Sequence, residues 1–191
     1  MKHNLTALAF VAIASAAHAG VIWDEGVDGD LSGDRLVPTD LTFAVETNTL
    51  IATSVQGDRE YVHFHLPTGS VLSQLWLTTW TGNDQIAFIA VQEGSVFTEP
   101  PTNTDVSKLL GYTHFGPGAG NLGQDILPAM GQGPGSIGFV PPLTGSDYTF
   151  WIQQTGANAV TYSLDFVVTP EPVSLLAFAG FAALAARRRR R

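Results

Sequence analysis

The sequence predicts an all-β protein: a single antiparallel, jelly-roll-like β-sandwich, flanked by an N-terminal signal helix and a short C-terminal transmembrane helix. Short runs rich in Val, Ile, Thr and aromatic residues recur along the chain, and Gly, Asn, Asp or Pro separates most of them. One run, residues 61–66, places Val62, Phe64 and Leu66 on one face, which is typical of a half-buried strand. Outside the termini, no stretch shows the apolar period of a helix.

The predicted strands occupy, in chain order, residues 41–45, 49–55, 61–66, 71–78, 85–92, 109–114, 148–154 and 161–168. Residues 81–84 and 156–158 predict hairpin connections, because Gly and Asn accept the backbone conformations that tight turns need. The glycine-rich residues 116–138 have no period, and they predict an extended loop across the sandwich or one of its ends.

The N-terminal residues have the layout of a secretory signal peptide. Lys2 supplies a positive start and residues 5–17 form an apolar run, after which Ala17 and Ala19 provide a small-x-small cleavage site before Gly20. We therefore expect residues 1–19 to be removed and residues 20–169 to be exported as one domain.

The C-terminal residues 170–191 contain a break, an apolar helix and a cationic stop. Pro170, Glu171 and Pro172 come first, the uncharged residues 173–186 follow, and the chain ends with Arg187, Arg188, Arg189, Arg190 and Arg191. Arginines resist translocation, so they predict a cytoplasmic C-terminus, in agreement with the signal peptide. At about 1.5 Å per residue the helix would span about 21 Å, less than the roughly 30 Å of a hydrocarbon core. The segment thus predicts a marginal, temporary membrane tether.

This tail resembles a PEP-CTERM sorting signal, in which a P-E-P motif, a short apolar helix and an arginine cluster stand in this order at the extreme C-terminus. The resemblance implies that an exosortase, a membrane protease, cuts near the P-E-P motif. The protein then passes to the cell surface or an extracellular matrix, where polysaccharide is an expected partner. A simple single-span anchor is the alternative. The same tail occurs on proteins labelled ice-binding, but isolated T-x-T pairs, such as Thr47 with Thr49, do not form the repeated array of an ice-binding face.

The exported residues also resemble the bacterial pre-peptidase C-terminal domain. The segments that carry this resemblance are residues 61–66, 72–77, 84–91, 147–152 and 162–166. The resemblance implies a jelly-roll-like accessory module of secreted proteins without a catalytic role. The chain departs from the family pattern where the last strand pair begins, because Asp147 precedes Tyr148 and the glycine lies earlier, at Gly145.

Charge limits the partners of the exported domain. Residues 20–169 hold three basic side chains, Arg35, Arg59 and Lys108, against sixteen Asp and Glu, so their net charge is −13. Nucleic acid is excluded as a partner, because its binding needs Lys and Arg to neutralise phosphates, whereas divalent cations are permitted. The chain has no cysteine, so the core, alone or with bound metal, must hold the fold together.

We predict no cofactor, and the alternative is calcium bound at one acidic segment. The oxygen-bearing side chains Asp28, Asp30, Ser32 and Asp34 are spaced two apart with glycines between some of them, as in D-x-D-x-S-x-D loops. The segment lacks the glutamate that closes an EF-hand loop. Without calcium, the segment is a solvated acidic turn.

Histidines and tryptophans are the other candidate binding residues. His63 and His65 share a strand face and would suit zinc if a third ligand joined them, with His114 the other exported histidine. Simple exposure on an amphipathic strand is the interpretation that we favour. Surface tryptophans can stack on sugars, but we expect Trp76 and Trp151 in the core and leave Trp80 open.

Enzyme signatures are absent from the sequence. It has no G-x-S-x-G motif, no cysteine nucleophile and no phosphate-binding glycine loop before a helix. We therefore predict a non-catalytic surface or matrix-associated protein whose sandwich is a binding or structural module. A small secreted hydrolase, acting on glycan or peptide through an unrecognised carboxylate or histidine site, is the alternative.

Overall fold

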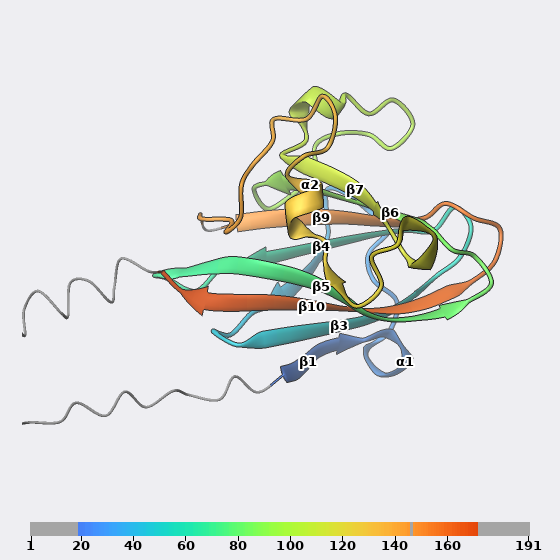
Figure 1. The fold of residues 1–191 in the computed structure, drawn as a ribbon, viewed down its shortest axis with the longest axis horizontal. Helices are drawn as coiled ribbons and strands as arrows, with labels where there is room; N and C mark the ends of the chain where they lie inside the picture. Colours follow the sequence, from blue (N-terminus) through green and yellow to red (C-terminus); the bar gives the residue numbers. More distant parts are fainter. Residues whose placement is uncertain (1–18, 146, 172–191) are drawn as a thin grey trace, which may run out of the picture.

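The computed structural model describes residues 19–145 and 147–171, in which two five-stranded β-sheets face each other across an apolar core (Figure 1). Sheet A has the strand order β1-β3-β10-β5-β8, and sheet B has the order β2-β4-β9-β6-β7. The predicted all-β, two-sheet architecture is confirmed.

The strands are β1 (Ala19–Asp24), β2 (Thr39–Thr42), β3 (Thr47–Ser54), β4 (Arg59–His65), β5 (Ser70–Gly82), β6 (Ala87–Glu93), β7 (Gly111–Phe115), β8 (Gln124–Asp125), β9 (Asp147–Gln154) and β10 (Val160–Pro170). The short helices are α1 (Glu25–Asp28), η1 (Val106–Lys108), η2 (Pro117–Ala119) and α2 (Leu127–Met130). Each predicted strand overlaps an observed one, whereas β1 and β8 have no counterpart in the sequence prediction.

Apart from the β6–β7 pair, consecutive strands lie in opposite sheets. The predicted hairpins at residues 81–84 and 156–158 are therefore wrong, because they lead from β5 to β6 and from β9 to β10, each crossing between sheets. Turn residues predict a chain reversal, but the apolar face of the next strand decides which sheet that strand joins. Asp84 links the two connections, since its carboxylate accepts hydrogen bonds from the backbone and side-chain amides of Asn158 and from the side chain of Gln154.

Two edge pairs are parallel rather than antiparallel. Strand β1 runs parallel to β3, and β2 runs parallel to β4, while the other strand pairs among the described residues are antiparallel. The prediction of a wholly antiparallel sandwich is wrong at these edges. The physical reason is the crossing through the opposite sheet, which returns the chain in its original direction.

Aromatic rings join the two sheets at the centre of the core. Phe64 of β4 stacks on Phe43 with ring centroids 4.1 Å apart and meets Phe166 of β10 edge-on at 5.8 Å. Phe150 of β9 meets Phe166 edge-on at 5.5 Å. Val62, Phe64 and Leu66 are all buried, so the alternation predicted for residues 61–66 is confirmed.

A β-bulge in β5 separates the two tryptophans of this strand. Leu164 lies opposite Leu77 and Ser163 lies opposite Thr79, so Thr78 is the extra residue. Trp76 is half-buried on the outer face of sheet A, while Trp80 packs against the core. The prediction of a core position for Trp76 is wrong, because its neighbours Leu75 and Leu77 face the core and Trp76 points the other way. The inserted Thr78 reverses the alternation after it, so that Trp80 faces inward.

The glycine-rich segment, residues 116–138, is a long connection along the sandwich, as the sequence predicts, but it contains short helices and a strand that the sequence does not predict. It contains η2, β8 and α2, and α2 lies against β7 and β5 along one side of the sandwich (Figure 1). Leu127 and Met130 enter the core. Glycine permits this close approach, because a Cβ on Gly131 would overlap the carbonyl oxygen of Phe139. The segment thus closes one side of the sandwich.

Both ends of the described chain lie at the same end of sheet A (Figure 1). Ala19 lies opposite Thr47, which in turn lies opposite Val167. No helix in the described part of the chain is long and apolar enough to cross a membrane, and the predicted transmembrane segment, residues 173–186, falls outside that part.

Replacing Phe64 by Ala is expected to lower the free energy of unfolding by about 3–5 kcal/mol, because the cavity separates rings from both sheets. Urea unfolding followed by tryptophan fluorescence measures the change. The control is Val140→Ala at a side chain that is 87% exposed. That variant should differ from the wild type by less than about 0.5 kcal/mol. A similarly small loss for Phe64→Ala would contradict the central position of this ring.

Candidate functional site

The outer face of sheet B carries a second apolar cluster, separate from the main core. Its buried members are Tyr61, Ala90, Phe97, Leu109 and Trp151. The ring centroid of Trp151 lies 6.1 Å from that of Tyr61 and 5.6 Å from that of Phe97. Phe97 belongs to the β6–β7 connection, residues 94–110, which we call the covering segment. Trp151 is therefore buried, as predicted, but on the outer face of the sheet and beneath this segment.

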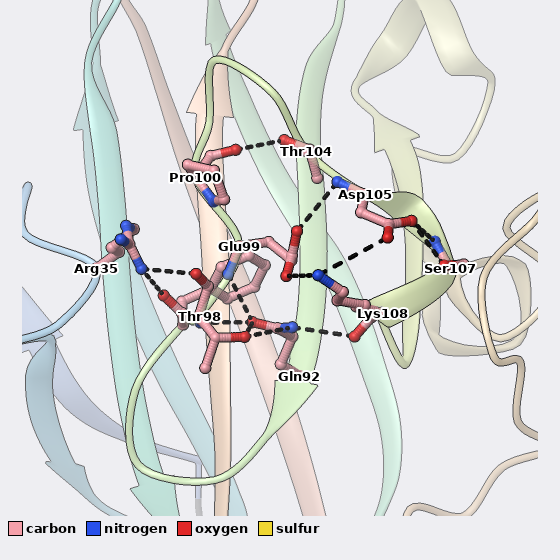
Figure 2. Close-up of polar contacts among 10 residues, drawn as sticks. Arg35, Gln92, Thr98, Glu99, Pro100, Thr104, Asp105, Ser107 and Lys108 are labelled. Atoms are coloured by element: carbon pink, nitrogen blue, oxygen red, sulfur yellow. Dashed lines mark hydrogen bonds and ion pairs between the residues drawn. The ribbon is translucent and has the colours of Figure 1, made fainter.

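Hydrogen bonds fix the covering segment to the sheet (Figure 2). The Gln92 side chain accepts from the backbone N–H of Thr98 at 2.7 Å and donates to the carbonyl oxygen of Lys108 at 3.0 Å. Arg35, from the connection before β2, donates through Nη1 to the carbonyl oxygens of Phe97 at 3.1 Å and Thr98 at 2.7 Å. A residue more than sixty positions away thus holds the segment, a contact that no local pattern predicts.

The C-terminal half of the covering segment is held by charge (Figure 2). Glu99 is buried, with the Lys108 ammonium 3.4 Å from its carboxylate and the Asp105 backbone N–H donating to it at 3.1 Å. Hydrogen bonds from the side chain and backbone of Ser107 lower the pKa of Asp105, and the charge of Lys108 adds to the effect. The carboxylates of Glu99 and Asp105 therefore balance the positive charge of Lys108.

Beyond the covering segment, a row of side chains crosses sheet B on its outer face. Arg59 lies opposite Gln153, Gln153 opposite Phe88, and Phe88 opposite His114. These four residues are here called the outer row. Each lies two positions along its strand from a member of the row Tyr61, Trp151, Ala90 and Tyr112, so both rows share the outer face. With strands about 4.8 Å apart, the outer row spans about 14 Å. Its side chains are half-buried or, for His114, exposed.

One hollow, which we call the aromatic hollow, opens at Phe88. Its volume is about 240 Å³, and its walls are Phe88, Thr104, Val106, Leu109, His114, Trp151, Gln153 and Thr155. Phe88 meets Trp151 edge-on at 4.9 Å and lies 5.8 Å from the ring of His114. An apolar floor with an amide and hydroxyls at its rim can hold a ring-shaped ligand and hydrogen-bond its substituents.

A second hollow, which we call the arginine hollow, opens at Arg59. Its volume is about 320 Å³, and its walls are Gly33, Asp34, Arg35, Arg59, Tyr61 and Pro101. None of the ion pairs among residues 19–145 and 147–171 involves Arg35 or Arg59. The Nε atom of Arg59 and the hydroxyl of Tyr61 are both buried with no hydrogen-bond partner in that part of the chain. Burial raises the pKa of Tyr61 to about 12, although the nearby charges of Arg59 and Arg35 act to lower it.

His63 and His65 lie at the opposite end of the same sheet face. The His63 Nδ1 atom is 2.8 Å from Asp40, and its Nε2 atom is 3.4 Å from Asp147, whose carboxylate also lies 3.0 Å from His65 Nδ1. His114 is in the outer row and does not join them. Across the described residues, no group of three or more His, Asp or Glu side chains is placed to hold a metal ion. Zinc binding therefore gains no support from this arrangement.

The four candidate calcium ligands do not converge on a common point through their hydrogen bonds. Asp28 accepts from the backbone N–H of Asp24 at 2.8 Å, within α1 and its N-cap. Ser32 donates to the carbonyl oxygen of Val37, while Asp34 accepts from the backbone N–H of Leu36 at 2.9 Å. Asp30 is exposed. These hydrogen bonds stabilise local turns. They do not support the calcium site, which stays a prediction.

The predicted sorting and cleavage residues lie partly within the described chain. Ala19 and Gly20 form the start of β1, and Pro170 ends β10 opposite Ser70. The Glu171 N–H donates to the carbonyl oxygen of Gly69 at 2.9 Å. Outside the described residues lie Ala17, Pro172, Arg187, Arg188, Arg189, Arg190 and Arg191.

A buried carboxyl lies on the inner face of β4, beneath this site. Glu60 is fully buried and accepts a hydrogen bond from the Tyr162 hydroxyl. Burial raises the pKa of Glu60 to about 8; the Tyr162 hydrogen bond opposes the shift, and the nearby carboxylates of Glu25 and Asp58 add to it. Neither sequence periodicity nor motif analysis predicts this group, because Glu60 precedes the alternating run.

Comparison of the chain with protein-family models, curated proteins and solved structures finds no match. The two hollows and the outer row are therefore interpreted from the geometry of this chain alone.

Glu60→Gln is expected to be more stable than the wild type at pH 8, by a few kcal/mol at most, and about equal to it near pH 4.5. The pKa of Glu60 is higher in the folded state, so its stabilising contribution is complete below the unfolded pKa and is lost as pH rises through about 8. Urea unfolding across this pH range measures the difference, with the exposed Glu93→Gln as control. A Gln variant whose stability falls as steeply as the wild type would contradict the assignment.

Arg35→Ala is expected to loosen the covering segment, because the segment loses its two hydrogen bonds to the guanidinium. Amide hydrogen exchange should accelerate about tenfold between Phe97 and Lys108, which corresponds to about 1.4 kcal/mol of local protection. Exchange in β10 should stay unchanged. A uniform acceleration through both sheets would indicate global destabilisation instead.

Proposed function

We propose that this chain is an exported, non-catalytic protein of the cell surface or extracellular matrix. Its PEP-CTERM-like tail directs it there by way of an exosortase, and the outer row of sheet B binds polysaccharide. The observation that carries the binding role is the aromatic hollow, where Phe88 and Trp151 form an apolar floor. The covering segment lies over the neighbouring part of the same sheet face.

The chemistry of the aromatic hollow supports a sugar ligand. The apolar face of a sugar ring packs on aromatic side chains, and its hydroxyls need hydrogen-bond partners around them. Gln153, Thr155 and Thr104 supply amide and hydroxyl groups at the rim. Nucleic acid is disfavoured, because residues 20–169 hold only three basic side chains to neutralise phosphates.

The placement of the chain ends supports a tethered stage before processing. Thr47, Val167 and both ends of the described chain lie at one end of sheet A, while Ser54 pairs with Val160 at the other. Arg59 follows Ser54 through a short connection, so the outer row lies at the end remote from the tail. A domain held to a membrane by its tail would present this row to the surroundings.

The junction between domain and tail supports cleavage near the P-E-P motif. Strand β10 stays paired with β5 as far as Pro170. A cut after this point would leave the strand and the core intact. A jelly-roll-like connection, as in pre-peptidase C-terminal domains, is part of the proposal, and the alternation of strands between the sheets is compatible with it.

The contacts of His63 do not suit the general base of a hydrolase. A histidine that serves as general base needs a free ring nitrogen facing the nucleophile. Both ring nitrogens of His63 face carboxylates, those of Asp40 and Asp147.

Fractionation of native cells with and without the exosortase gene tests the sorting role. The tailed form should accumulate in the membrane in the deletion strain and be replaced by a shorter, released form in the parent strain. Equal membrane retention in both strains would overturn the sorting role and favour a permanent anchor.

Phe88→Ala tests the binding role. Exported protein from the native culture should bind its matrix polysaccharide about two- to tenfold more weakly when the ring is removed, in line with the 0.5–1.5 kcal/mol typical of aromatic contacts. Affinity electrophoresis through gels containing the polysaccharide measures this. Phe88→Trp should retain binding, and Leu122→Ala, an exposed apolar side chain outside sheet B, is the control. Unchanged retention of Phe88→Ala would contradict the assignment.

A further inference from the structure

The basic side chains of the exported domain gather at one face. Arg35, Arg59 and Lys108 are the only basic residues among residues 20–169, where they are outnumbered by sixteen acidic ones. Arg35 and Lys108 hold the covering segment, and Arg59 belongs to the outer row of the same sheet face. Lys108 is neutralised by Glu99 and Asp105. The guanidinium groups of Arg35 and Arg59 remain without an ion-pair partner among the described residues.

The arginine hollow is built to receive one negative charge. The guanidinium groups of Arg35 and Arg59 line it together with a single carboxylate, that of Asp34, which leaves one net positive charge. Tyr61 is only 1% exposed, yet its hydroxyl has no hydrogen-bond partner in the described part of the chain. The Nε atom of Arg59 is likewise buried and without a hydrogen-bond partner there. Buried donors without acceptors are costly, and an anion seated there would supply the acceptors. Planar guanidinium groups match the two oxygens of a carboxylate.

The arginine hollow and the aromatic hollow are neighbours. Gln153 lies opposite both Arg59 and Phe88, so it separates them by two strand spacings, about 10 Å. Pro101 borders the first hollow and Thr104 the second, so the tip of the covering segment forms a wall of each. A linked pair of sugar rings can bridge this span.

We propose that the outer row binds an acidic polysaccharide, with the carboxylate of a uronic acid residue in the arginine hollow beside Arg35 and Arg59 and a neighbouring sugar ring on Phe88. This inference rests on the proposed polysaccharide-binding function and specifies its ligand class. The net charge of −13 does not prevent such binding, because charges more than about 8 Å away are screened at physiological ionic strength. The guanidinium groups act at contact distance and are screened less.

Isothermal titration of the exported protein with a tetramer of galacturonic acid tests the proposal. The fully methyl-esterified tetramer is the matched ligand, since it keeps the sugar chain and removes the charge. The free acid should bind at least about tenfold more tightly than the ester, because one charge-assisted hydrogen bond contributes about this much to binding. Arg59→Gln should remove this preference. Thr68→Glu, which lowers the net charge equally at an exposed turn in the β4–β5 connection, should keep it.

Tyr61→Phe separates a binding role from a structural one. Because its hydroxyl has no partner among the described residues, its removal should leave the melting temperature unchanged or higher. The affinity for the free acid should nonetheless fall about threefold or more, as expected when a donor to a charged group is lost. A lower melting temperature with unchanged affinity would assign the hydroxyl to the fold and remove it from the proposed site.

The outcomes distinguish this proposal from the function on which it rests. Equal binding of acid and ester, with Phe88→Ala weakening both, would overturn the anion site and leave the polysaccharide-binding function standing. Equal losses in Arg59→Gln and Thr68→Glu would assign the preference to overall charge and overturn the site. Binding of a sulfated glycan in place of the uronate would overturn the carboxylate assignment. If neither tetramer nor the native matrix polysaccharide bound, the proposed function itself would fail.

Discussion

The contact between the two sheets through Phe43, Phe64, Phe150 and Phe166 is the interaction on which the rest of the structure depends. The chain has no disulfide to limit its unfolded state, and residues 20–169 carry a large negative charge that opposes compaction. Burial of apolar area between the sheets must therefore supply the stability. These rings come from both sheets, so they also set the position of sheet B, on whose outer face the candidate site lies.

The candidate site exists because sheet B is only partly covered. An exposed sheet face normally carries polar side chains, but here the middle of the face is apolar and lies beneath the covering segment. Where the segment ends, apolar and polar groups meet at the boundary, and the aromatic and arginine hollows form there. Arg35 has two roles in this arrangement, since it ties the segment to the sheet and lines one of the hollows.

Electrostatics divide the domain into distinct regions. Burial raises the pKa values of Glu60, Glu25 and Asp58, and neighbouring carboxylates add to each shift. On the outer face of β4, Arg59 provides a local positive charge within an otherwise acidic surface. Adjacent residues of one strand thus meet opposite environments, as the alternation of a β-strand requires.

The sequence by itself determined what depends on neighbouring residues: the strand positions, the alternation at residues 61–66 and the order of motifs in the tail. Periodicity and turn chemistry are local properties, so a single chain reveals them. Only the tertiary structure decided the features that depend on distant partners. It decided that turns at residues 81–84 and 156–158 cross between sheets, and that the glycine-rich segment contains short helices and a strand. The bulge at Thr78 turned Trp80 inward. It also brought Arg35, Arg59 and Phe88 to one face, because strand order, which local propensity does not encode, sets which side chains become neighbours.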